Sequence, residues 1–550
     1  MRRSAAKLTA VVGQALLAEV NSGLIARSWS PSLEKTLHQL GCREFLSSSL
    51  VAGVIDSYLH RHPSLAFGFF NWASQQPGFS HDSATCESLL KSLSASRRFG
   101  SVEKIMKLVK SQKIILHPSA YRLLISSLLC GRRTQMAFNL FSELGPLVPQ
   151  IGPEVSNSLL AVLSSEGSMT NAHKVFDEML HRGIQFNTLG FGLFLWKACR
   201  KTSLSEILSF VDRVRNANFS GVNGSVVGLL MIHGFCSESR VKDAVSALEE
   251  LRRKDCKPDF MAYRIVAEKL REMRCTPDVE MVLKKKRKLS VAPRSTDYRD
   301  FIHDLISERL LNESKEIGEV IVSGDFPIED DTLNLLIGSV SAVDSSQAVS
   351  FLKFMIQKDR FPAQHSLIKL CESLCKHKKG DDLVEVLNLL SSKGYFKTVD
   401  TYNIMVSFLC KAGKVKEGYN VLQELKRKGL KPDVSSYNSL LDACCRGDLL
   451  RPAKRLWDEM FACGCSGNVE SYRILIGKFC EVGEMEDARQ LLYHMIGKGL
   501  EADESTYRSL LFQGNDPKLG LQIFKQCMEH DCVLGRRLLN PFIVFLCNQG

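Results

Sequence analysis

Apolar and polar residues repeat with a period of 35 between Val399 and Asp503. Three segments of that length follow one another: Val399–Asp433, Val434–Asn468 and Val469–Asp503. When they are aligned, the same residue types fall at the same offsets, as in Tyr402, Tyr437 and Tyr472, in Cys410, Cys445 and Cys480, and in Gly429, Gly464 and Gly499. A fixed period of this length indicates an array of structural repeats.

Each segment predicts two helices joined by a tight turn. In the first segment, apolar side chains three or four residues apart share one helical face. They are Tyr402, Met405, Val406 and Leu409. Gly413 stops this helix, and a second amphipathic run, 415–428, ends before Pro432, which cannot continue a helix. Neither helix can bury its apolar face alone, so we expect the repeats to stack into an all-α superhelical solenoid with an extended concave surface.

The same pattern extends towards the N-terminus. Tyrosines recur at the position of Tyr402, namely Tyr298, Tyr263 and Tyr121. Where the second helix crosses the first, only a small side chain fits, and alanine recurs there at Ala137, Ala172, Ala244, Ala348, Ala453 and Ala488. The repeats are expected to begin near Ser83, Pro118, Pro153, Thr188, Ser225, Phe260, Ser295, Asp330, Gln364, Val399, Val434, Val469 and Glu504. We therefore expect about 13 helix–turn–helix repeats over residues 83–535.

The two ends of the chain differ from the array. Residues 1–35 carry arginine, serine and alanine with few acids, which is typical of an organelle transit peptide. A basic first helix of the array is the alternative for this segment. Residues 36–82 are expected to form a degenerate N-terminal helical unit, and residues 536–550 a C-terminal helical cap.

The composition is that of a folded protein, with 24% charged and 45% hydrophobic residues. No stretch approaches 18 consecutive apolar residues, so we expect no membrane span. Cysteines recur at the apolar end of the first helix, where a free thiol acts as a small core side chain. They are Cys199, Cys236, Cys375, Cys410, Cys445 and Cys480. We therefore expect no metal site and no cofactor. The formal net charge of +12 suits a polyanionic partner.

Several stretches of the repeat Val399–Asp433 resemble the consensus of the pentatricopeptide repeat family. They are Tyr402-Asn403, Leu409-Cys410-Lys411-Ala412-Gly413, Glu424-Leu425 and Lys428-Gly429-Leu430-Lys431-Pro432-Asp433. The period of 35 and the closing Pro-Asp favour this family over tetratricopeptide repeats, whose period is 34. The resemblance implies a right-handed superhelix of the P-class that plant organelles contain.

In proteins of this family, the fifth and last residues of each repeat recognise one RNA base. The resemblance assigns these positions here to Asn403 with Asp433, Asn438 with Asn468, Asn157 with Asn187, and Asn334, whose partner position holds Ala363. Asn both donates and accepts hydrogen bonds, whereas Asp only accepts them. The pair that contains Asp is expected to favour U, the two Asn–Asn pairs are expected to favour C, and Asn334 is expected to bind a pyrimidine.

Phosphate contacts would supply most of the affinity for RNA and make it dependent on salt. Lys411 and Arg446 follow the periodic cysteine, a position that faces the RNA in the family, and Arg473 is a third candidate. The alternative for each is a solvated helix end. The fifth position is arginine in five repeats, which departs from the family pattern: Arg122, Arg264, Arg299, Arg473 and Arg508.

The leading hypothesis is non-catalytic, sequence-selective binding of single-stranded organelle RNA, in transcript stabilisation, processing, splicing or translation. The alternative is a protein-binding helical scaffold, such as an organelle ribosome-associated subunit. The arginines at the fifth position favour this alternative, as do polar residues at the second position: Asp400, Ser435 and Glu470. An enzyme would need a catalytic constellation, and the sequence contains no evident one. We expect a monomer in the mitochondrion, with the chloroplast as the alternative, and RNA-processing or ribosomal proteins as further partners.

Overall fold

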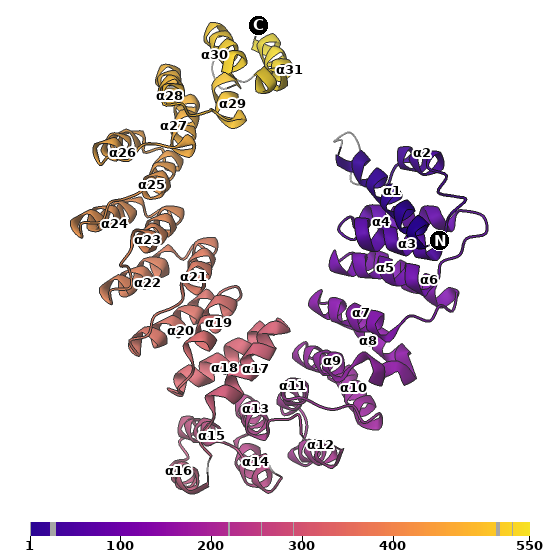
Figure 1. Ribbon diagram of the computed structural model, residues 1–550. Coiled ribbons are helices and arrows are strands. Elements are labelled where there is room, and N and C mark those ends of the chain that lie inside the picture. Colours follow the sequence, from indigo (N-terminus) through magenta and orange to yellow (C-terminus); the bar gives the residue numbers. More distant parts are fainter. Residues whose placement is uncertain are drawn as a thin grey trace. The chain divides into compact units, whose positions relative to one another are not determined.

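The computed structural model describes residues 2–21, 29–217, 220–254, 256–289, 291–512, 517–530 and 532–549. Within these residues the regular secondary structure is helical, and the one β-bridge joins Asp259 to Val291. The chain divides into two compact parts, Met1–Glu329 and Asp330–Gly550, which we call the N-terminal part and the C-terminal part. The prediction of an all-α array of about 13 helix–turn–helix repeats is confirmed (Figure 1).

The N-terminal part contains seven of the helix pairs. Their first helices are α5 (Ser83–Ala95), α7 (Pro118–Cys130), α9 (Pro153–Ser165), α11 (Thr188–Ala198), α13 (Gly224–Ser237), α15 (Phe260–Glu272) and α17 (Ser295–Ser307). Their second helices are α6 (Phe99–Ser111), α8 (Thr134–Leu144), α10 (Met169–His181), α12 (Leu204–Ala217), α14 (Val241–Arg253), α16 (Thr276–Leu289) and α18 (Leu311–Ser323). A short 3-10 helix, η2 (Gly145–Ile151), follows α8.

The C-terminal part contains six helix pairs and one further helix. The first helices are α19 (Asp330–Val340), α21 (Gln364–Lys376), α23 (Val399–Lys411), α25 (Val434–Arg446), α27 (Val469–Val482) and α29 (Glu504–Phe512). The second helices are α20 (Ser345–Gln357), α22 (Gly380–Ser392), α24 (Val415–Arg427), α26 (Leu450–Ala462), α28 (Met485–Gly497) and α30 (Pro517–His530). Helix α31 (Cys532–Gln549) packs on α29 and α30, where we expected a cap.

Residues before the array form helices as well. They are α1 (Arg2–Asn21), α2 (Pro31–Gln39), α3 (Ser48–Val54), the π-helix η1 (Ile55–Leu59) and α4 (Pro63–Ser74). Helix α1 packs on α3 and η1 and buries Val12 and Leu16. Part of the expected transit peptide, residues 22–28, lies outside the described residues. The transit peptide itself stays a prediction.

The periodic residues lie where the array needs them. The tyrosines Tyr402, Tyr437 and Tyr472 are at most 1% exposed, because the next first helix packs over them. All six periodic alanines are fully buried, as expected at a helix crossing. The periodic glycines Gly429, Gly464 and Gly499 follow the second helices with φ of 77°, 79° and 74°, a left-handed conformation that favours glycine. The recurring residue types are therefore explained by burial in the core and by the reversal of the chain after each second helix.

The periodic cysteines act as core side chains at five of the six predicted positions. Cys199, Cys236, Cys410, Cys445 and Cys480 are buried, and Cys375 is half-buried. Burial raises the pKa of Cys410 to about 12, so this thiol is protonated at neutral pH. Across the described residues, no group of His, Cys, Asp or Glu side chains is arranged to hold a metal ion. None of the described helices combines the length and apolarity that crossing a bilayer requires.

Candidate functional site

In the repeats that end at Asp433 and Asn468, the last residue lies directly before the next first helix and acts as its N-cap. Asp433 and Asn468 have extended backbones, and their side-chain oxygens accept the N–H groups of Ser436 and Ser471, each at 3.0 Å. An N-cap of this kind contributes about 1 kcal/mol to helix stability. The two residues that we predicted for base recognition therefore also have a structural role.

Asn403 lies beside this cap. It is the fifth residue of its repeat, on α23, and its Nδ2 donates a hydrogen bond to Asp433 Oδ2 at 2.9 Å. The hydroxyl of Ser436, on α25, donates to Asn403 Oδ1. Asn403 and Asp433 are both half-buried, so part of each polar group faces solvent. The structure thus brings the predicted pair into direct contact.

The next repeat has the same arrangement. Asn438 Nδ2 donates to Asn468 Oδ1 at 3.0 Å, and the Ser471 hydroxyl donates to Asn438 Oδ1 at 2.5 Å. Asn468 is exposed and Asn438 is half-buried. Two consecutive repeats therefore present equivalent polar pairs, one of Asn with Asp and one of Asn with Asn.

Asn334 has a different set of partners. Its Nδ2 donates to the carbonyl of Asp330 at 2.9 Å, and its Oδ1 accepts the N–H of Ala363 at 2.7 Å. Both partners are backbone atoms, because Ala363 has no polar side chain. The amide of Asn334 is consequently turned onto the backbone.

Asn157 and Asn187 lie close together, but Asn157 is only 1% exposed. Asn157 Nδ2 donates to the carbonyls of Pro153 and Gln185 at 2.8 and 2.9 Å, and its Oδ1 accepts the N–H of Asn187 at 2.9 Å. The Asn187 side chain caps α11 through the N–H of Gly190. Since its amide is buried and bonded on both sides, we leave Asn157 out of the residues proposed below.

The three predicted phosphate contacts are all exposed. Lys411 places its ammonium 4.9 Å from the centroid of the Phe408 ring, a cation–π contact. Arg446 pairs with the carboxylate of Asp442, one turn earlier on α25, at 2.8 Å.

Arg473 is held by two hydrogen bonds to Glu470, and these bonds keep the pKa of Glu470 below its ordinary value. The other fifth-position arginines also have a carboxylate partner, in the pairs Arg122–Glu154, Arg264–Glu268, Arg299–Glu329 and Arg508–Glu504. A phosphate would have to compete with these carboxylates. Among the three predicted contacts, Lys411 is therefore the best placed for RNA.

The hairpin α17–α18 covers first helices of the N-terminal part. Helix α17 packs on α11 and α13, which belong to repeats two and three places earlier (Figure 1). Ser158 Oγ on α9 donates to Glu308 at 2.6 Å, across 150 residues of sequence. Glu313 on α18 accepts from Ser165 Oγ at 2.7 Å and pairs with Lys197 at 2.9 Å. The Lys197 and Glu313 side chains are 10% and 5% exposed, so this ion pair is buried.

Two further bonds hold the hairpin. Arg132 donates to the carbonyl of Arg309 at 2.5 Å, and Tyr298 Oη donates to Asp259 Oδ2 at 2.5 Å. Asp259 caps α15, and burial raises its pKa against the effect of the hydrogen bonds that it accepts. These bonds thus attach the hairpin to the four repeats that begin near Pro118, Pro153, Thr188 and Ser225.

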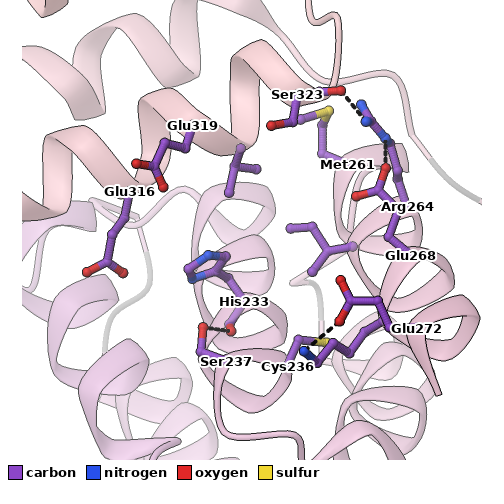
Figure 2. A pocket seen from close by; sticks show the side chains of 13 residues that line it. His233, Cys236, Ser237, Met261, Arg264, Glu268, Glu272, Glu316, Glu319 and Ser323 are labelled. Atoms are coloured by element: carbon purple, nitrogen blue, oxygen red, sulfur yellow. Dashed lines mark hydrogen bonds and ion pairs between the residues drawn. The ribbon is translucent and has the colours of Figure 1, made fainter. Parts of the chain in front are cut away.

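A cavity of about 370 Å³ remains between α18 and the first helices α13 and α15. Figure 2 shows Glu316 and Glu319 of α18 on one side, and His233, Glu268 and Glu272 on the other. Arg264, a fifth-position residue, bonds to the carbonyl of Ser323 at the end of α18 (Figure 2). Four glutamates outnumber the two basic residues that line this space, Arg264 and Lys269, so it is unfavourable for a phosphate.

The sequence interpretation missed Ser436 and Ser471, the third residues of their repeats. Both are fully buried and bond to the fifth-position Asn of the preceding repeat. The start of each helix was visible in the sequence, because Asp and Asn are favoured N-cap residues. Their contact with the preceding repeat had no local signal.

Comparison with protein-family models finds PPR repeats in several places. The model described as "PPR repeat family" matches residues 397–446 and 434–481, and the one described as "PPR repeat" matches residues 154–184, 229–256 and 470–500. A pentatricopeptide repeat-containing protein of Arabidopsis thaliana is 50% identical over 399 residues, which are 72% of this chain and 63% of that protein. A second Arabidopsis protein of the same description, named as mitochondrial, is 27% identical over 162 residues, 29% of this chain and 26% of that protein. The chain spans less than two thirds of the length of these relatives.

Two solved structures also align with the chain. The pentatricopeptide repeat protein PPR10 in complex with an 18-nt psaJ RNA element is 16% identical, with a TM-score of 0.40 and coverage of 95% of this chain and 79% of that chain. Yeast Rmd9p in complex with a 16-nt target RNA is 13% identical, with a TM-score of 0.25 and coverage of 78% and 86%. At these TM-scores neither alignment supports an inference about this chain.

Proposed function

Because the chain belongs to the pentatricopeptide repeat family, we propose that its C-terminal part binds single-stranded RNA selectively, without catalysing a reaction. The observation that carries this proposal is the pair of equivalent contacts, Asn403 with Asp433 and Asn438 with Asn468, in consecutive repeats. Each pair offers both hydrogen-bond donors and acceptors at a half-exposed position.

The hydrogen-bond donors and acceptors of the two pairs are complementary to different bases. Uracil presents an N3–H donor, which a carboxylate oxygen of Asp433 can accept, while an amide N–H of Asn403 donates to a uracil carbonyl. Cytosine presents a bare N3 acceptor, which would face the Asp433 carboxylate with an unfavourable acceptor–acceptor contact. The amide of Asn468 has an N–H for that acceptor. We therefore propose U opposite Asn403 and C opposite Asn438.

The covered first helices of the N-terminal part limit where the RNA can lie. There the α17–α18 hairpin bonds to Ser158, which is next to Asn157, and to the fifth-position residue Arg264. Substantial helix packing in the described residues of the C-terminal part joins only helices that are close in sequence. One base per repeat over the six repeats that start between Asp330 and Glu504 gives a footprint of about six nucleotides.

The test is selection from a random RNA library with the full-length protein, followed by binding measurements. We expect adjacent U and C in the selected RNAs. Asn403→Ala and Asn438→Ala should each remove the preference for one base, while Asn420→Ala, at an exposed position on α24, should change nothing. Selection of no sequence, with unchanged binding by both variants, would refute base recognition and favour the protein-binding scaffold.

In the cell, binding of this kind would stabilise a transcript, expose it for processing or splicing, or control its translation. We place this activity in the mitochondrion, with the chloroplast as the alternative, and propose that the protein acts as a monomer. Sequencing of RNA that co-purifies with the tagged protein from each organelle tests the location. Recovery from neither organelle would contradict it.

A further inference from the structure

The orientation of an asparagine amide decides what a base meets. The Nδ2 end donates and the Oδ1 end accepts, so an amide that turns over exchanges the two and loses its selectivity. In this chain the helix caps fix the orientation. Asn468 Oδ1 accepts the backbone N–H of Ser471, which can only donate, so the group of Asn438 that faces this oxygen must be Nδ2. Asp433 only accepts, and it imposes the same orientation on Asn403.

A serine hydroxyl holds the other end of each amide. The Ser471 hydroxyl accepts the backbone N–H of Asn468 at 3.1 Å. Two oxygens lie within reach of its single hydrogen, Asn438 Oδ1 at 2.5 Å and Asn468 Oδ1 at 2.9 Å, and the shorter distance favours the bond to Asn438. Ser436 makes the equivalent bond to Asn403 Oδ1. Both serines are fully buried, so water does not compete for these bonds.

The same chain contains two repeats in which this arrangement is incomplete. Asn334 is followed by Ala363, which lacks a capping side chain, although Ser366 stands at the third position. Asn157 has Asn187 as its cap, but the third position holds Gly190. In both repeats the amide turns away and bonds to the carbonyl of the residue four places before it. The bond from the asparagine Nδ2 to the capping side chain occurs in the two repeats that have both the cap and the hydroxyl.

The space around Gly190 explains one of these cases. A Cβ at Gly190 would lie 2.6 Å from Asn157 Oδ1, 2.9 Å from the backbone oxygen of Asn157 and 3.0 Å from its Cα, which is too close for any side chain. The repeat of Asn157 therefore has no room for a serine at the third position, whereas the repeat of Asn334 has the serine but lacks the capping side chain.

We propose that Ser436 and Ser471 are positioning residues that fix the amides of Asn403 and Asn438 and thereby set base selectivity. The inference rests on the RNA binding proposed above and adds a third residue, from the following repeat, to each pair. It predicts that selectivity depends on a buried hydroxyl that no base touches.

The loss test compares full-length variants on four RNAs that differ only at the base opposite Asn403. Ser436→Ala should lower the preference for U over C about fivefold, the factor that one hydrogen bond contributes. Ser436→Thr keeps the hydroxyl and should retain the preference within about twofold. Ser439→Ala, at a half-buried position on the same helix, is the matched control and should match the wild type.

The gain test completes the arrangement at Asn334. Ala363→Asp supplies the missing cap, with Ser366 already in place, and should raise the preference for U opposite Asn334 about fivefold. Aspartate is a favourable N-cap residue, so this variant should fold at least as well as the wild type.

If Ser436 only stabilised the fold, Ser436→Ala would lower the affinity for all four RNAs equally. Equal weakening of the four by Ser436→Ala, with an unchanged ratio, would therefore overturn the inference, and so would an unchanged ratio opposite Asn334 in Ala363→Asp. If Asn403→Ala also leaves the ratio unchanged, the proposed function fails as well. Loss of selectivity in Asn403→Ala without loss in Ser436→Ala would refute the positioning role of Ser436 and leave the proposed RNA recognition in place.

Discussion

Replacing Glu313 by Gln should detach the α17–α18 hairpin from the first helices that it covers. Glu313 and Lys197 are 5% and 10% exposed and lie 2.9 Å apart. Removal of one partner from a buried ion pair costs about 3–5 kcal/mol, because the other charge stays buried without compensation. Gln preserves the volume and the acceptor for Ser165, so we expect the lower end of this range, about 3 kcal/mol. That free energy corresponds to roughly a hundredfold increase in hairpin opening.

Hydrogen exchange of the full-length protein measures this opening peptide by peptide. Amides of α17 and α18 should exchange about a hundredfold faster in Glu313→Gln, while those of α23 and α25 should not change. Glu319→Gln is the control, because its pair with Lys315 is long, 3.9 Å, and its side chain is 41% exposed. Such a surface pair contributes at most about 1 kcal/mol. The double change Lys197→Met with Glu313→Gln should restore most of the protection against hydrogen exchange, since it removes the buried ammonium that has lost its partner.

Low pH should likewise increase the opening of the α17–α18 hairpin in the wild-type protein. Burial acts against ionisation of Glu313, but Lys197 and the hydroxyl of Ser165 outweigh it and hold the pKa of Glu313 below its ordinary value. A lowered pKa means that the stabilisation is present above the pKa of the unfolded chain and is lost as pH falls through the folded value. Hairpin exchange should therefore accelerate below about pH 4 in the wild type and much less in Glu313→Gln. Equal exchange in Glu313→Gln and Glu319→Gln would refute this account of the hairpin.

Two further predictions concern the core and the RNA contact of the C-terminal part. Ala453→Leu should lower the free energy of unfolding by about 1–3 kcal/mol in a denaturant titration, because Ala453 is fully buried where α26 meets α25, whereas the same change at the exposed Ala462 should be neutral. Lys411→Gln should reduce the slope of log affinity for RNA against log salt concentration by about 0.7, the contribution of one phosphate contact to a single strand. Lys416→Gln, at an exposed position on α24, should leave that slope unchanged. Equal slopes for the two lysine variants would remove Lys411 from the interface.

Most helix boundaries were predictable because they depend on short-range chemistry. The first helices begin at the expected residues, with α13 one residue earlier, at Gly224. Proline, glycine and capping side chains act within a few residues of their own position. The alanines were predictable for the same reason, because the crossing of two helices within one repeat requires a small residue at a fixed offset.

The candidate site was less predictable. The sequence places Asn at the fifth position of four repeats, and all four look equivalent there. Their surroundings differ, because Asn157 is buried under α11, while Asn403 and Asn438 bond to the last side chain of their own repeat and to a serine of the following one. The sequence also did not reveal that the fifth-position arginines form ion pairs with nearby carboxylates. A repeat pattern specifies which residue stands at an offset, and the neighbours decide what its polar atoms bond to.

The sequence by itself determined the all-α class, the 35-residue repeat and the residues that fill each core position. These follow from periodicity, since stacking is the way in which amphipathic helix pairs bury their apolar faces. Only the tertiary structure decided the orientation of the asparagine amides and the position of the α17–α18 hairpin. The reason is range: the amide of Asn438 depends on a serine 33 residues away, and Ser158 meets Glu308 across 150 residues. No local pattern in the chain records contacts at those separations.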